Sequence, residues 1–340
     1  MSDEIKPIFF DDEPQHQKET TQEKKLEPIT SFFDHEREIK PIDFGDEKSD
    51  FIPSTSIIDD DDDDFVSSKP TTIINKESNF ISFFGSGESG KSVILSSMLY
   101  AMQTKYGVLS PKIGTPNTKE AEVLLEEFFE NISRGILPGR TTRDQVTRMD
   151  LVFKPNNKSK KVPPIDLTFL ETSGENWNEI RRAGMLHSSI DAYLSADIPL
   201  TFILVTGYRA AHREDALLKK FLFLLEQKRH NLNNTNVILV ISKWDQSGSQ
   251  HVSSEEELDN FVQEKLPLTH NFLETNGLAK TYYTIGELYS REGENRERIK
   301  NLNLDSAYRL SKWLYKSITG VDVEYQGTFG EQLKWSLGLK

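Results

Sequence analysis

The sequence predicts an α/β fold in which helices cover both faces of a mostly parallel sheet, preceded by an acidic arm that we expect to be disordered. From residue 71 onward, apolar runs of strand length alternate with runs of helical spacing. The runs at 200–205 and 236–241 are almost continuously apolar, which is typical of central strands buried on both faces. A glycine-rich turn joins the first apolar run, at 79–84, to a helical run.

The other elements follow from the same patterns. A basic segment at 154–161 is expected to be the turn between two neighbouring strands. The helix at 120–131 is indicated by four apolar residues at helical spacing: Val123, Leu124, Phe128 and Ile132. Further strands are predicted at 146–153, 165–170 and 282–285, and further helices at 93–102, 217–225 and 306–318.

Composition narrows the class of protein. The chain has 340 residues and no cysteine, so disulfides and thiolate metal sites are excluded. No apolar run approaches the roughly 20 residues that a membrane-spanning helix needs. The acidic start, Met1-Ser2-Asp3-Glu4, lacks the apolar core of a signal peptide. We therefore expect no transmembrane segment and a cytoplasmic location.

The net charge of −13 belongs to the N-terminal arm. Residues 1–70 hold 21 acidic and 8 basic residues, whereas 71–340 hold 33 of each. The arm includes six consecutive aspartates, 59–64, that no packed core would neutralise. This charge argues against nucleic acid as a partner. We expect a disordered arm at 1–70, a globular domain at 71–320 and a tail at 321–340.

The arm contains a repeated short motif. Residues 4–13 and 38–47 share eight of ten positions, and a looser copy lies at 26–34. The copies keep isoleucine and phenylalanine between acidic flanks, which favours docking of protein partners. Several copies on one flexible arm would raise avidity. A low-complexity spacer with an accidental duplication is the alternative.

The glycine-rich turn matches the phosphate-binding pattern G-x-x-x-x-G-K-[ST]. Its glycines let the main chain approach a ligand, its lysine can reach terminal phosphates, and its serine hydroxyl can bind Mg²⁺. A turn without a ligand is the plain alternative, but the strand before it and the helix after it favour a nucleotide. The eight residues are Gly85, Ser86, Gly87, Glu88, Ser89, Gly90, Lys91 and Ser92.

Two later segments could respond to the terminal phosphate. The strand at 165–170 leads into Glu171, and Gly174 follows three residues later. The acid can hold a Mg²⁺-bound water, and the glycine N–H can sense the γ-phosphate. Thr141, in the loop before the preceding strand, can complete Mg²⁺ coordination. An ordinary strand end and an ordinary loop are the alternatives.

A third segment could choose the base. Ser242, Lys243 and Asp245 come directly after the buried run at 236–241. A carboxylate at Asp245 can accept hydrogen bonds from the N1–H and the exocyclic amine of guanine, and adenine lacks that pair of donors. The stem of Lys243 can lie over the base plane.

Together these motifs resemble the GTPase branch of the P-loop nucleotide-binding proteins over residues 78–320. The phosphate loop is similar to that of heterotrimeric G-protein α subunits. The set of motifs is most similar to that of bacterial double-GTPase domains. Pro138 to Thr141 match the proline-then-threonine switch of those domains, and Trp313-Leu314-Tyr315 match the helix that ends them. The resemblance implies a three-layer P-loop NTPase fold, GTP or GDP with Mg²⁺ as ligands, and a bacterial signalling or defence role.

The chain departs from the family's pattern at four places. Glu171 replaces the usual aspartate, and Ser242 replaces the asparagine that braces the phosphate loop. Glu175 stands where Ras-like proteins have a water-orienting glutamine, so slow hydrolysis is expected, with a partner's arginine as a possible aid. The last base-binding motif has no clear match, and residues 284–287 stand in its place.

We therefore expect a GTP-binding switch that hydrolyses GTP slowly with Mg²⁺ and docks protein partners on residues 1–70. Lys91, Thr141, Gly174 and Glu175 are the predicted catalytic residues, and Ser92, Thr141 and Glu171 the predicted metal-binding residues. An ATP-using P-loop enzyme is one alternative, and a nucleotide-locked scaffold without turnover is the other.

Overall fold

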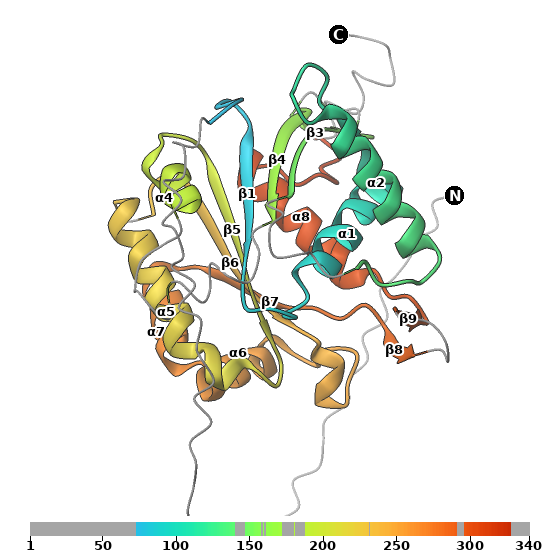
Figure 1. Cartoon of the computed structure of the whole chain (residues 1–340). Coiled ribbons are helices and arrows are strands. Elements are labelled where there is room, and N and C mark those ends of the chain that lie inside the picture. Colours follow the sequence, from blue (N-terminus) through green and yellow to red (C-terminus); the bar gives the residue numbers. More distant parts are fainter. Residues whose placement is uncertain are drawn as a thin grey trace, which may run out of the picture. The chain divides into compact units, whose positions relative to one another are not determined.

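A seven-stranded sheet forms the centre of the domain (Figure 1). The computed structural model describes residues 73–139, 147–157, 159, 161–171, 180, 188–230, 232–290 and 296–327. In sheet order the strands are β2 (Gly107–Pro111), β3 (Thr147–Pro155), β4 (Ile165–Glu171), β1 (Asn79–Phe84), β5 (Leu200–Gly207), β6 (Thr235–Ser242) and β7 (Ala279–Tyr282). From β4 to β7 the pairing is parallel, whereas β2 with β3 and β3 with β4 are antiparallel. The carboxyl ends of five strands therefore meet at one edge.

Helices cover both faces of this sheet (Figure 1). One face carries α1 (Lys91–Ala101), which continues as a π-helical turn (Met102–Tyr106), with α2 (Thr118–Ser133) and α8 (Asp305–Thr319). The other carries α4 (Ser188–Ser195), α5 (Ala211–Lys228), α6 (Glu255–Lys265) and α7 (Pro267–Asn276). A separate two-stranded sheet pairs β8 (Glu287–Ser290) with β9 (Glu297–Lys300). The predicted fold class is confirmed.

The central strands divide their side chains between two cores. On β1, Ile81 and Phe83 enter the core under α1, α2 and α8, while Phe80 and Phe84 enter the core under the opposite helices. All eight residues of β5 are buried. Alternate residues of a strand point to opposite faces, so a strand covered on both sides must be apolar throughout. This explains the continuous apolar runs at 200–205 and 236–241.

Local signals set the ends of several helices. Ser254 caps α6, since its hydroxyl accepts the N–H of Glu257 at 3.2 Å. Pro267 starts α7, where its missing N–H costs nothing. Gly277 and Gly320 end α7 and α8 in left-handed conformations that side chains disfavour. Within the described ranges, no helix has the length and apolarity to cross a membrane.

Two details of the sequence-based assignment are wrong. Val123 is 63% exposed, because the buried stripe of α2 runs through Ala121 and Leu125 instead. The last strand of the large sheet is β7 at Ala279–Tyr282, three residues earlier than predicted. Tyr283 still donates its N–H to the Ile241 carbonyl at 2.8 Å, but the chain then leaves the sheet edge.

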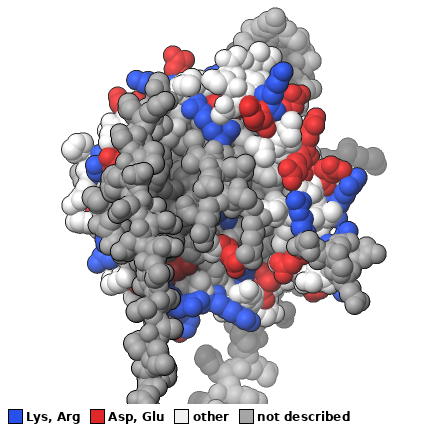
Figure 2. Space-filling view, in the orientation of Figure 1, with Lys and Arg blue, Asp and Glu red and all other residues white. Residues whose placement is uncertain are grey.

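The surface charge matches the neutral composition of residues 71–340. Figure 2 shows acidic and basic side chains interspersed over the described part of one face. Several of them form exposed pairs, such as Arg134 with Glu130 at 2.8 Å. Exposed pairs of this kind contribute little to stability.

Candidate nucleotide-binding site

The candidate site lies at the carboxyl edge of the parallel strands. The turn at 85–90 joins β1 to α1, and the ends of β5 and β6 lie beside it at Gly207 and Ser242. Strand order changes direction at β1, because β4 lies on one side of it and β5 on the other. Open α/β sheets bind their ligands at such a point, outside the carboxyl ends of the strands.

The main chain of the turn is curved by two residues in the left-handed region. Glu88 has φ 63° and Gly90 has φ 95°. The Ser89 N–H closes the turn onto the Ser86 carbonyl at 3.3 Å. Successive N–H groups in such a turn form a concave surface that binds anions.

The start of α1 adds to this anion-binding surface. Gly90 is its N-cap, with no side-chain cap, and the first turn contains no acidic residue. The first turn of α1 therefore contains no acidic side chain that would neutralise the partial positive charge of the helix end. A phosphate is the ligand that such a helix start favours.

Two glycines of this turn, Gly85 and Gly87, differ in their steric surroundings. A Cβ on Gly85 would overlap the Val205 carbonyl oxygen and lie 2.9 Å from Ser89 Oγ, so only glycine lets the turn pack on β5. Among the described atoms, a Cβ on Gly87 would meet nothing within 4 Å. The turn is thus closed against the sheet at Gly85, and at Gly87 the described structure leaves open space.

Lys91 is held against the phosphate loop. Its Nζ donates to the Gly85 carbonyl at 2.9 Å and to the Ser86 carbonyl at 2.8 Å. The residue is only 8% exposed, so the ammonium is buried beside the curved main chain. This places a positive charge where the turn would receive phosphates. Ser92 follows it in the first turn of α1.

Ser242 ties the phosphate loop to the neighbouring strands. Its hydroxyl donates to the Ser89 carbonyl at 2.6 Å and to the Thr206 carbonyl at 3.2 Å, and the residue is 1% exposed. Thr206 in turn donates its hydroxyl to Glu214 on α5 at 2.6 Å. The serine therefore braces the loop at the position where the GTPases that the sequence resembles have an asparagine.

The loop that carries Asp245 is fixed by its neighbour. Trp244 is fully buried among Tyr208, Phe261 and Tyr282. The main-chain N–H of Trp244 donates to the Tyr283 carbonyl at 3.2 Å. A large buried aromatic side chain fixes the direction of the adjacent residue. Asp245 is thereby held at the same edge of the sheet as the phosphate loop.

The electrostatics of Asp245 follow from this position. Burial raises the pKa of its carboxyl, because a low-dielectric environment disfavours the charged form. A hydrogen bond to its own main chain and the charge of Lys243 act in the opposite direction without cancelling the effect. The carboxyl is thus partly desolvated, and hydrogen-bond donors from a ligand would stabilise its ionised form.

The segment predicted to replace the last base-binding motif lies beside this loop. Thr284 is buried, and its hydroxyl donates to Gln250 Oε1 at 2.7 Å. Its main-chain N–H donates to the Ser306 hydroxyl at 3.3 Å. The Tyr283 hydroxyl contacts the Ser97 hydroxyl on α1. Sequence analysis missed Gln250 and Ser306, because these contacts join loops that are far apart along the chain.

Several predicted residues lie outside the description. Thr141, Gly174 and Glu175 are outside the described residues, and so is the side chain of Glu171. The main chain of Glu171 pairs with Phe83, one residue before the end of β1, so this position lies beside the phosphate loop. Among the described side chains, no group of three or more His, Asp and Glu residues could hold a metal ion.

The domain is thus an α/β fold with a mostly parallel sheet, in which a turn that matches the phosphate-binding pattern joins the first strand to the first helix. No protein-family model and no curated protein sequence matches the chain. Among solved structures, Methanosarcina barkeri Roco2 RocCORdC bound to GDP is similar, with 18% identity and a TM-score of 0.32. The match covers 76% of this chain and 53% of that one, so the chain spans about half its length. The narrower resemblance to bacterial double-GTPase domains stays a prediction.

Proposed function

We propose that the chain binds a guanine nucleotide with Mg²⁺ and hydrolyses GTP to GDP as a molecular switch. One observation carries the proposal most directly. The hydroxyl of Ser242 joins the phosphate loop, at the Ser89 carbonyl, to the strand that leads into Asp245. The proposed phosphate site and the proposed base site would thus be joined through one hydrogen-bonded frame.

At the phosphate end, the loop amides, the start of α1 and Lys91 would hold the β- and γ-phosphates. Ser92 and Thr141 would bind Mg²⁺, with Glu171 in its outer shell. The uncapped helix start and the open space at Gly87 fit a phosphate chain with its metal. When bound, Mg²⁺ neutralises charge on the transferred phosphoryl group.

At the base end, Asp245 would accept hydrogen bonds from the N1–H and the amine of guanine. Its neighbour Trp244 contacts three aromatic rings and is held by a main-chain hydrogen bond to Tyr283, which limits the freedom of the carboxylate. The stem of Lys243 passes close to Gly207, because a Cβ built on Gly207 would lie 3.9 Å from the Cδ of Lys243. The residues at this end therefore form a preorganised acceptor for a purine with two donors.

The rate of hydrolysis would depend on Gly174 and Glu175. The N–H of Gly174 would respond to the γ-phosphate, and Glu175 would orient the attacking water. A carboxylate near the phosphates is less favourable than an amide, because like charges repel. We therefore propose slow intrinsic turnover, and docking of protein partners on the repeats of residues 1–70.

Calorimetric titration of the full chain with GDP and ADP, in Mg²⁺, tests this proposal. We expect GDP to bind at least about 100-fold more tightly than ADP, since adenine leaves the Asp245 carboxylate without its two donors. Mass spectrometry should also find guanine nucleotide released from the purified protein. Failure of both nucleotides to bind at millimolar concentrations would contradict the proposal. Equal affinities for GDP and ADP would favour the ATP-using alternative. Nucleotide that stays bound without being hydrolysed would favour the nucleotide-locked scaffold.

GDP affinity should also depend on pH through Asp245. The pKa of its carboxyl is raised without ligand, and the guanine donors should lower it on binding. Affinity is then full above the ligand-free pKa and falls as the pH drops through it, by up to about tenfold per pH unit. Calorimetry between about pH 7 and pH 4 measures this, with pyrophosphate as the control for titration of the phosphates. Parallel losses for GDP and pyrophosphate would show that Asp245 is not involved.

A further inference from the structure

A buried tyrosine joins the proposed base end of the site to the helix that follows the phosphate loop. Tyr283 is the first residue after β7, and it is 3% exposed. Its main-chain N–H donates to the Ile241 carbonyl at 2.8 Å, and its carbonyl accepts the main-chain N–H of Trp244 at 3.2 Å. The main chain of Tyr283 is therefore bonded to both ends of the short segment that contains Ser242 and Lys243.

The side chain of Tyr283 reaches α1. Its hydroxyl contacts the Ser97 hydroxyl within the core under α1, α2 and α8. Ser97 directs its one hydroxyl proton to the main-chain carbonyls of Val93 and Ile94, so the tyrosine is the donor in this contact. Burial raises the pKa of the Tyr283 phenol, which therefore keeps the proton that it donates.

This contact adds a second polar link between α1 and the base loop, which we define as residues 242–245. The first link is the Ser242 hydroxyl, which donates to the Ser89 carbonyl of the phosphate loop at 2.6 Å. Ser97 lies six residues beyond Lys91 on α1, which is about 9 Å farther along the helix axis. Two attachments at different heights along α1 restrain its direction as well as its position.

The neighbouring tyrosine supports the base loop from the other face of the sheet. Successive residues of a strand point to opposite faces, and Tyr282 belongs to the core under α4, α5, α6 and α7. Its ring lies 5.6 Å from that of Trp244, and the guanidinium of Arg309 lies 4.1 Å from the ring centroid of Tyr282. Tyr282 thus packs against the side chain of Trp244, whereas Tyr283 bonds its main chain and ties it to α1.

We propose that Tyr283 is a positioning residue that aligns the base loop with the phosphate loop and thereby raises selectivity for guanine. This inference rests on the proposed guanine nucleotide site. One nucleotide must contact the phosphate loop and Asp245 at once, and its length fixes the separation that both contacts need. The Tyr283 hydroxyl holds this separation before the ligand arrives, so binding does not have to order the base loop.

This role predicts a loss that is confined to the base end. The phosphate loop keeps its own contacts, because Lys91 donates to the carbonyls of Gly85 and Ser86 and none of these groups touches Tyr283 in the described structure. Pyrophosphate has no base, and the adenine of ADP lacks the pair of donors that Asp245 would accept. Both should therefore bind as before when the tyrosine hydroxyl is removed, while GDP should bind more weakly.

Calorimetry of the full chain in Mg²⁺, with GDP, ADP and pyrophosphate in turn, tests this role. Tyr283→Phe removes only the hydroxyl, and Ser97 keeps its own acceptors, so no buried donor loses its partner. We expect the GDP affinity to fall by about threefold to tenfold, which is the effect of losing one buried hydrogen bond. The affinities for ADP and pyrophosphate should stay within about twofold, so the preference for GDP over ADP falls by the same factor.

Two further variants make the test specific. Ser97→Ala removes the other partner of the contact and should lower the GDP affinity by a similar factor, whether or not Tyr283→Phe folds. Tyr315→Phe is the matched control. Tyr315 is 1% exposed in the same core, but it packs against Phe153 of β3, and its hydroxyl donates to the Pro163 carbonyl at 2.6 Å. This control loses the same chemical group and should keep its GDP affinity within about twofold.

The outcomes separate the positioning role from the proposed function. If the parent chain prefers GDP, but Tyr283→Phe and Ser97→Ala bind it within about twofold of the parent, the role is wrong and the nucleotide site stands. Equal losses for GDP and pyrophosphate would also overturn the role, because the effect would then lie at the phosphate loop. An equal loss in Tyr315→Phe would overturn it as well, since general packing would explain the effect. A parent chain without a preference for guanine nucleotide overturns the proposed function and the role together.

Discussion

Replacing Lys91 with alanine should remove most of the nucleotide affinity. The ammonium is buried and fixed by the carbonyls of Gly85 and Ser86 at 2.9 and 2.8 Å, so it is already placed for a phosphate. Loss of one partner of a buried, hydrogen-bonded charge pair costs about 2–5 kcal/mol, which is at least about 30-fold in affinity.

Calorimetry with GDP and Mg²⁺ measures this loss, and the melting temperature without nucleotide checks that the variant is folded. The check is needed because Lys91→Ala also leaves two loop carbonyls without their donor. Lys119→Ala is the control, since it removes the same charge from an exposed position near the start of α2. Affinity of Lys91→Ala within threefold of the parent chain would mean that phosphates do not bind at this loop.

The sheet and its main helices could be predicted because their signals are local. Continuous apolar runs identified β5 and β6, since a strand covered on both faces has no polar side. The glycine-rich turn was placed from its glycine and lysine spacing and from the strand and helix on either side, and the geometry at Gly85 and Gly90 shows why glycine is needed there. Its binding of phosphate stays a prediction. In each case neighbouring residues along the chain contain the whole pattern.

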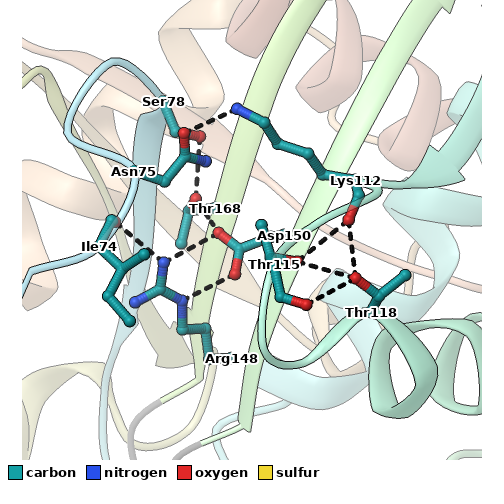
Figure 3. A network of polar contacts seen from close by, with 9 residues as sticks. All are labelled: Ile74, Asn75, Ser78, Lys112, Thr115, Thr118, Arg148, Asp150 and Thr168. Atoms are coloured by element: carbon teal, nitrogen blue, oxygen red, sulfur yellow. Dashed lines mark hydrogen bonds and ion pairs between the residues drawn. The ribbon is translucent and has the colours of Figure 1, made fainter.

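Other features could not be predicted because they depend on contacts between distant segments. Ser242 and Ser89 are 153 positions apart, and only the packing of β6 against the loop shows that the serine acts as a brace. Asp150 lies in the strand predicted at 146–153, yet its carboxylate is buried and accepts hydrogen bonds from Arg148 and from Thr168 of the neighbouring strand (Figure 3). A sequence pattern assigns a face, but it does not say which loop or segment covers that face.

Asp245→Asn should reverse the base preference from guanine to xanthine nucleotides. The carboxylate offers two acceptors, which match the N1–H and the amine of guanine. An asparagine offers one acceptor and one donor, which match the N1–H and the 2-carbonyl of xanthine. In the variant, the guanine amine would face another donor at a half-buried position. A mismatched polar contact of this kind costs about 1–3 kcal/mol for each unpaired group, so the ratio of affinities should change by about 100-fold or more.

Calorimetry with GDP and XDP, on the parent chain and the variant, measures that ratio. The control is Asp259→Asn on α6, which makes the same chemical change at a half-exposed carboxylate paired with Lys280 at 3.0 Å. It should leave the ratio unchanged. Because Ser242 and Lys91 are untouched in both variants, the phosphate contribution cancels in the ratio, and a change reports base contact alone. If Asp245→Asn keeps the parent's preference, the carboxylate does not contact the base, and the physical reason for choosing GTP over ATP is lost while the phosphate site remains.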